Sequence, residues 1–352
     1  MGIKDIAKLA NVSIGTVDRV LNKRVGVSKE TEKRILKIIK ETGYVKNTTA
    51  SRLKLASVKK IKIAVLVPES LNKWSYWKLP KKGIAKAVEE LRELGVTAVY
   101  NEFSNSSSFI KKGEEILCKK YDALITVPYF EKECNRLLKH AGAKKIPVVF
   151  LDTEIKLNGM ANFIRQDAHT AGLVAGRLLH GLVGNDGQYF LINLLNERGT
   201  QVNNKQREDG FREFFRSINV NANIKIINHH LNDVFRVTRE IKDWFDGDHL
   251  KGIFVTNSRA HLIPNILKQH EITNTHIIGF DLNKQNLQYL KRGEIDFLIN
   301  QQPEYQGYAA IKSLFNYLTK EDESELNLNI PVEIIVKENL PAGDSSPGLK
   351  LS

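Results

Sequence analysis

The stretch IKDIAKLANVSIGTVDRVLN, residues 3–22, decides the fold of the first part of the chain. Its first half repeats apolar residues at the spacing of one helix face, and these residues are Ile3, Ile6, Ala7 and Ala10. Ser13 follows a break in that pattern and can cap a second helix, whose inward residues are Val17, Val20 and Leu21. A third helix, capped by Ser28 and ended by Gly43, completes a small all-α unit.

Positive charge is concentrated in the same part of the chain. Residues 1–60 contain 15 Lys and Arg against 5 Asp and Glu, which accounts for +10 of the net charge of +13. This asymmetry predicts a polyanionic partner for the N-terminal unit. The competing interpretation, a membrane-surface helix, is disfavoured because the unit lacks a broad apolar face with aromatic anchors.

The second helix exposes the side that would enter a DNA major groove. With its apolar residues turned inward, the outward residues are Ile14, Gly15, Asp18, Arg19 and Asn22. Arg19 is the expected base reader because its guanidinium matches the O6 and N7 of guanine. Ser13 and Thr16 are expected phosphate contacts. An ordinary solvated helix face is the alternative.

From residue 61 onward, strands alternate with helices, which predicts parallel sheets with right-handed connections. The expected strands are 61–67, 97–103, 123–127, 147–152, 188–195, 224–227, 252–256 and 276–280. The expected helices are 79–94, 107–119, 131–141, 170–182, 205–217, 234–245 and 262–270. Because the alternation restarts after Asp167, we expect two α/β lobes in tandem.

Polar and aromatic residues follow the predicted strands, at the sheet edge where α/β domains bind ligands. In the first lobe they are Asn72, Trp74, Trp77, Tyr129 and Asp152, and in the second Arg207, Asn257, Asp281 and Gln301. Aromatic faces and bidentate polar groups together are typical of a sugar site. Each residue also has a structural alternative: Asp152 and Asp281 could cap helices, and Trp77 could belong to a hydrophobic core.

Residues 3–22, together with Val27-Ser28-Lys29-Glu30-Thr31 and Gly43-Tyr44, closely resemble the helix-turn-helix of the lac/galactose repressor family. The resemblance covers about 340 residues and implies a sensor similar to periplasmic sugar-binding proteins. It implies that a linker helix containing Asn47 and Ala50 orders on DNA, and that Leu53 wedges into the minor groove. Packing of Leu53 on the sensor is the alternative.

Two positions depart from the family pattern. The family usually has proline where Lys46 stands and serine where Asp18 stands. A carboxylate is repelled by phosphates but can accept a hydrogen bond from cytosine N4. The operator sequence of better-known members is therefore not transferable.

The same resemblance matches Arg207, Asn257, Asp281 and Gln301 to ligand-contacting positions, and Asp152 and the Trp74–Trp77 loop more loosely. We expect a sugar or sugar acid as effector, with a polyol or a purine as alternatives. The resemblance also implies a homodimer on a palindromic double-stranded operator. Induction and corepression by the effector both remain open.

The expected organisation is a helix-turn-helix headpiece (1–46), a linker (47–60), a two-lobed, type I periplasmic-binding-protein-like sensor (61–342) and a tail (343–352). The first lobe is expected at about 61–165 and 301–322, and the second at about 166–300 and 323–342. By analogy the chain crosses between lobes near Ile164–Asp167, Asn300–Pro303 and Glu321–Glu325.

No motif for a catalytic nucleophile, a phosphate loop, a metal or another cofactor is found, and His229-His230 lacks a third ligand at metal spacing. The charged N-terminus is unlike a secretory leader, and Cys118 and Cys134 suit a reducing cytoplasm. We therefore expect a cytoplasmic protein without membrane contact that is not an enzyme. A transport-type sugar-binding protein or a sugar-acting enzyme are the alternatives.

Overall fold

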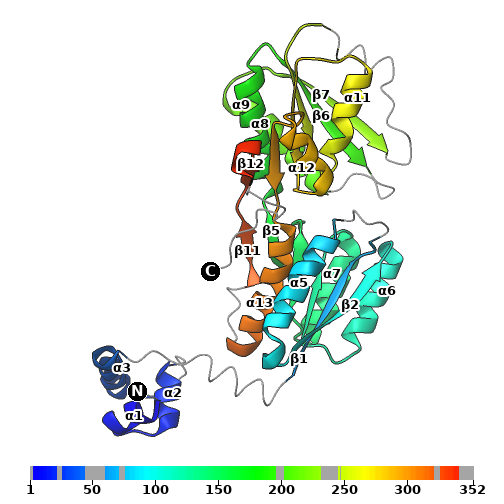
Figure 1. Ribbon diagram of the computed structural model, residues 1–352. Coiled ribbons are helices and arrows are strands. Elements are labelled where there is room, and N and C mark those ends of the chain that lie inside the picture. The colour runs from blue at the N-terminus through cyan, green and yellow to red at the C-terminus, as the bar shows by residue number, and fades with distance from the viewer. Residues whose placement is uncertain are drawn as a thin grey trace. The chain divides into compact units, whose positions relative to one another are not determined.

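The computed structural model describes residues 3–21, 26–43, 60–70, 76–195, 202–230, 245, 247–320 and 326–340. The chain divides into two compact units, Met1–Lys59 and Lys60–Ser352 (Figure 1). Several predictions fall outside the described residues: those on Asn22, Asn47, Ala50, Leu53, Asn72 and Trp74, the linker helix, the crossing at 321–325, the tail and, apart from Phe245, the helix at 234–245.

The first unit contains the three predicted helices, which are α1 (Ile3–Leu9), α2 (Ile14–Leu21) and α3 (Lys29–Thr42). The Ser13 hydroxyl accepts the Thr16 backbone N–H at 3.1 Å, and the Ser28 hydroxyl accepts that of Thr31 at 3.2 Å, so both predicted N-caps are confirmed. Gly43 ends α3 with a left-handed φ of 61°. The core of the unit is made of Ile6, Ala7, Ala10, Val17, Val20 and Ile35.

The first lobe of the larger unit is built on a six-stranded parallel sheet in the order β11-β5-β4-β3-β1-β2 (Figure 1). Its strands are β1 (Ile61–Pro68), β2 (Val96–Phe103), β3 (Ala123–Thr126), β4 (Val148–Asp152), β5 (Asn162–Gln166) and β11 (Leu328–Ile330). Its helices are α5 (Lys78–Glu90), η1 (Arg92–Leu94), α6 (Ser106–Leu117), α7 (Glu131–Ala143) and α13 (Pro303–Lys320). The central strands are buried apolar runs, as a parallel sheet covered on both faces requires.

The second lobe repeats this architecture with the sheet order β12-β10-β9-β8-β6-β7, in which β12 runs antiparallel to β10. Its strands are β6 (Gln188–Leu195), β7 (Asn223–His230), β8 (Lys251–Val255), β9 (Thr275–Phe280), β10 (Phe297–Asn300) and β12 (Glu333–Ile335). Its helices are α8 (Ala168–Val183), α9 (Val202–Ser217), η2 (Ala260–Leu262), α11 (Ile263–Gln269), α12 (Lys284–Lys291) and η4 (Lys337–Asn339). The two-lobed α/β class predicted from the strand–helix alternation is confirmed.

The third crossing between the lobes differs from the sequence expectation. β11 pairs with β5 in the first sheet, so residues 328–330 belong to the first lobe and not to the second. The chain crosses after Ile330, because β12 already pairs with β10. Strands of three residues carry too few side chains to show a period-two pattern, which explains why β11 and β12 were not anticipated. β5 has five residues but is partly polar and only partly buried, so its sequence does not show a clear strand pattern either.

Helices α8 and α9 approach each other closely through two glycines. A Cβ on Gly172 would overlap the carbonyl oxygen of Arg207, and one on Gly210 would overlap that of His169. Gly83 and Gly307 play the same part between α5 and α13 in the first lobe. The pair at α8 and α9 fixes the position of Arg207, a candidate site residue.

We predict that Gly172→Ala lowers the free energy of unfolding by about 1–3 kcal/mol, because the added methyl group forces the helices apart. Gly181 is the matched control: it lies on the same helix, and a Cβ there meets nothing within 4 Å. Gly181→Ala should raise the free energy of unfolding by about 0.5–1 kcal/mol, as expected for removing an exposed helical glycine. Urea unfolding of both variants measures the difference, and effects of the same sign would contradict the close-packing argument.

Candidate functional site

Three candidate residues lie where strands of the two sheets end. Asp152 is the last residue of β4, Asp281 directly follows β9, and Gln301 directly follows β10. Asp152 and Asp281 have φ values of 76° and 68°, in the left-handed region that residues other than glycine rarely adopt. Such backbone strain is concentrated at functional sites, where the surrounding structure holds it in place. Both carboxyl groups are buried.

Arg207 on α9 is the buried cation of this cluster. Its Nη1 donates to the carbonyl of Thr256 and its Nη2 to Oε1 of Gln301, both at 2.6 Å. The guanidinium carbon lies 3.6 Å from the centroid of the Phe280 ring, in cation–π geometry. These contacts come from the ends of β8, β9 and β10, so the sheet edge itself orients the arginine.

Gln301 connects the arginine to a carboxylate. Its Nε2 donates to both oxygens of Asp281, at 3.0 and 2.9 Å, while its Oε1 accepts from Arg207. Gln306 on α13 donates to the Gln301 carbonyl at 2.9 Å and accepts the backbone N–H of Asp152 at 3.0 Å. Asn203 on α9 also reaches Asp152, at 3.4 Å. The structure thus brings four predicted residues from both lobes, Asp152, Arg207, Asp281 and Gln301, into one network.

Burial dominates the electrostatics of this network. Desolvation raises the pKa of Asp281 to about 7, although Arg207 and Gln301 act in the opposite direction. Desolvation also raises the pKa of Asp152, against the lowering effects of the Tyr76 hydroxyl and Arg207. The pKa of Arg207 is lowered by its own burial, despite the two carboxylates nearby.

The raised pKa of Asp281 makes stability depend on pH. Since the folded pKa of about 7 exceeds the unfolded value near 4, the folded chain holds this proton more tightly. The resulting stabilisation is complete below about pH 4 and is lost as the pH rises through about 7. We predict that the wild type loses up to about 1.4 kcal/mol of unfolding free energy per pH unit in this window. Asp281→Asn should not show this loss.

The measurement is urea unfolding of wild type and Asp281→Asn between about pH 5 and 8. The free energy of the wild type should fall relative to that of the variant as the pH rises. Asp186→Asn, which changes an exposed carboxylate on the same lobe, should keep the wild-type slope. A difference between wild type and Asp281→Asn that is constant with pH would refute the shifted titration.

Several buried polar atoms around the network have no hydrogen-bond partner among the described residues. They are Thr153 Oγ1, Asn203 Oδ1, Asn204 Oδ1 and Arg207 Nε. Unpaired buried donors and acceptors are costly, and a hydroxyl-bearing ligand can satisfy both kinds. Asn203 lies four residues before Arg207, on the same helix face, and that spacing is the sequence clue that could have identified it.

Two of the predicted aromatic residues, Trp77 and Tyr129, belong to or pack against the core of the first lobe. Trp77 is 5% exposed and packs edge-on against Tyr76 and Tyr129, with ring centroids 5.2 and 6.0 Å away. Its neighbour Tyr76, and not Trp77, lies beside Asp152. Tyr76 stands within the aromatic run that suggested a sugar site, but it was not among the predicted ligands.

Asn257 is engaged locally. Its Nδ2 donates to the carbonyl of Leu194 at 2.8 Å, and its Oδ1 accepts the backbone N–H of Arg259 at 3.2 Å. Its ligand contact stays a prediction. The alternative role of Asp281 as a helix cap is wrong, because Asn283 caps α12.

The predicted reading face of the first unit lies on α2. Ile14 is 45% exposed, Gly15 and Arg19 are exposed, and Thr16 and Asp18 are partly exposed. The hydroxyls of Ser13 and Thr16 lie 2.9 Å apart and bind each other. Arg19 extends toward the turn before α3, with Nη1 3.1 Å from the position that a Cβ on Gly26 would take. The contacts of these residues with DNA remain predictions.

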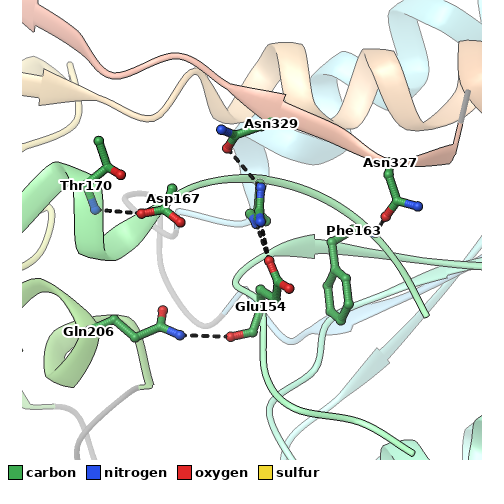
Figure 2. Close-up of polar contacts among 8 residues, drawn as sticks. Glu154, Phe163, Asp167, Thr170, Gln206, Asn327 and Asn329 are labelled. Atoms are coloured by element: carbon green, nitrogen blue, oxygen red, sulfur yellow. Dashed lines mark hydrogen bonds and ion pairs between the residues drawn. The ribbon is translucent and has the colours of Figure 1, made fainter. Parts of the chain in front are cut away.

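The connections between the lobes are joined by one side chain. Gln166, at the end of β5, donates its Nε2 to the carbonyls of Asn300 and Pro331, each at 3.0 Å. These three residues lie on the first, second and third connections. Asp167 then caps α8 by accepting the Thr170 backbone N–H at 2.6 Å (Figure 2).

In the described part of the chain, no group of His, Cys, Asp and Glu side chains is arranged to hold a metal ion, and no helix is long and apolar enough to cross a membrane. Cys118 is exposed and Cys134 is buried, and both are free thiols. Burial raises the pKa of Cys134 to about 12, which makes that thiol unreactive.

Comparison with known proteins identifies both units. Residues 2–47 match the model of bacterial regulatory proteins of the lacI family, and residues 63–322 match a periplasmic binding protein domain. A ribose operon repressor of Halalkalibacterium halodurans is 27% identical over 98% of both chains. A PurR transcriptional repressor of Mannheimia succiniciproducens is 29% identical over 62% of this chain and 61% of its own. A putative LacI transcriptional regulator from Bacteroides fragilis has 27% identity and a TM-score of 0.69, covering 80% of this chain and 98% of its own. The chain therefore belongs to the lacI family of bacterial regulatory proteins, with a periplasmic binding protein domain as its larger part.

Proposed function

We propose that the chain is a cytoplasmic transcription repressor of carbohydrate-utilisation genes, which binds a palindromic operator as a homodimer and responds to a small sugar-like effector. The observation that carries the proposal is the buried network of Arg207, Asp152 and Asp281, which draws charged groups from both lobes. A ligand that binds such a network favours one arrangement of the lobes over another. The helix-turn-helix unit on the same chain supplies the output.

The DNA contacts follow the family pattern in this proposal. Two headpieces occupy successive major grooves, with Arg19 reading a base in each half-site. Asn47, Ala50 and Leu53 belong to the linker helix, and Leu53 inserts at the operator centre. In the first lobe Asn72, Trp74 and Tyr129 contact the effector, and Trp77 supports Tyr129 from the core. In the second lobe Asn257 assists Arg207.

The repressor function is tested by selecting bound fragments from genomic DNA with the purified chain. We expect a palindromic fragment that binds at least about 1,000-fold more tightly than random DNA. Sugars, sugar acids, polyols and purines are then added one at a time to the complex. Absence of any preferred fragment would refute the proposed function as a DNA-binding regulator. Conversion of a sugar to product would favour an enzyme instead.

A further inference from the structure

A chain of hydrogen bonds joins the second lobe to two of the connections between the lobes (Figure 2). It begins at Gln206, near the start of α9, whose Nε2 donates to the carbonyl oxygen of Glu154 at 3.1 Å. Glu154 lies in the first lobe, two residues after the end of β4. This bond requires the start of α9 to lie against the segment that follows β4. The arrangement of the lobes in which these two segments are in contact is called closed below.

The acceptor of this bond is held in place by the sheet. Arg165 on β5 binds the Glu154 carboxylate through Nε, at 2.7 Å, and through Nη2. Its Nη1 donates to Oδ1 of Asn329 on β11, at 2.8 Å. Within the sheet, Arg165 is the register partner of Asp152 on one side and of Asn329 on the other. Glu154 is therefore fixed relative to Asp152 and to the first and third connections.

We propose that Gln206 is a positioning residue for effector binding, which stabilises the closed lobes through Glu154 without touching the effector. The inference rests on the proposed function. A group that favours the binding-competent arrangement raises the affinity for every ligand of that arrangement by the same factor. For one hydrogen bond across the lobes, that factor is about three- to tenfold.

The variant that isolates the bond is Gln206→Glu, which keeps the size of the side chain, removes the N–H donor and places a second carboxylate near Glu154. Gln206→Lys restores a donor at the same position. Lys205→Gln is the matched control, because Lys205 is exposed and pairs with Asp209 inside α9. The probes are D-ribose, D-galactose, D-glucuronate, myo-inositol and adenine, with Kd measured by titration calorimetry on the full chain.

Gln206→Glu should raise the Kd of each probe that binds by one common factor of about three- to tenfold. Gln206→Lys should stay within about twofold of the wild type, which is less than the loss of one hydrogen bond would cause, and Lys205→Gln should match the wild type. An unchanged Kd would overturn the proposal. So would a change confined to one probe, since a direct contact and not closure would then be the cause.

Amide hydrogen exchange on the ligand-free chain tests the same bond without an effector. Gln206→Glu should speed exchange both in the segment after β4 and at the start of α9, while α5 stays unchanged. Equal exchange in variant and wild type would overturn the proposal whether or not a probe binds. If no probe binds the wild type, the sugar effector of the proposed function fails, and the exchange result alone then decides the role of Gln206.

Discussion

Arg207→Ala is expected to weaken effector binding by at least about 100-fold while leaving operator affinity without effector unchanged. The guanidinium is the only cation within the buried network described here, and it binds Thr256, Gln301 and the face of Phe280. Its removal leaves two buried carboxylates without a countercharge and frees Gln301 to rotate. Calorimetry with the tightest-binding sugar and fluorescence anisotropy with labelled operator measure the two effects.

Loss of folding must be separated from loss of binding in this variant. Removing one partner of a buried charge network costs about 3–5 kcal/mol. Because the pKa of Asp281 is already about 7 and Arg207 lowers it, the variant takes up a proton and is best studied near pH 6. Arg212→Ala, five residues further on α9, removes a partly exposed cation paired with Glu208 and should bind the effector normally. A retained effector response in folded Arg207→Ala would rule out its role at the site.

Arg19→Ala should reduce affinity for the selected operator by roughly 5- to 150-fold, the range of one bidentate arginine–guanine contact. Affinity for random DNA should fall much less, because only one phosphate-attracting charge is lost. The measurement is fluorescence anisotropy with operator and scrambled duplexes at a fixed salt concentration, together with operators substituted at each base of a half-site.

Lys37→Ala controls for the loss of a positive charge on the same unit, since Lys37 is exposed on α3 and pairs with Glu41. It should weaken operator and scrambled DNA alike. Arg19→Ala should bind operators substituted at one base position with a smaller loss of affinity than the wild type shows, and should not differ from the wild type at the other positions. An unchanged base preference would show that Arg19 contacts phosphate or solvent and would assign base reading to other residues of α2.

The elements that could be predicted from sequence are those with a clear period or cap. Helix starts are indicated by the caps Ser13 and Ser28, and one helix end is indicated by Gly43. Apolar runs such as 61–67 indicate central parallel strands. The strands β5, β11 and β12 are short or partly polar and depend on neighbours distant in sequence. Their pairing, and with it the third crossing, is decided by tertiary contacts that no local pattern records.

The candidate site was predictable in the residues that stand at strand ends and not in the residues that support them. Asp152, Asp281 and Gln301 stand at strand ends, a position that sequence reveals. Gln306, Asn203 and Tyr76 act through contacts between elements far apart in the chain. Asn257 shows that a polar residue after a strand can also form hydrogen bonds within its own loop, and its contact with a ligand stays a prediction.

Gln166 joins the three connections between the two lobes at one point. Because its amide nitrogen binds the carbonyls of Asn300 and Pro331, the three connecting backbones are tied at one point and cannot slide past one another. Relative sliding of the connections would break these hydrogen bonds, so they favour rotation of the lobes about that point. A joint restricted in this way loses less conformational entropy when a ligand arrests it, so more of the ligand's interaction energy remains available for signalling.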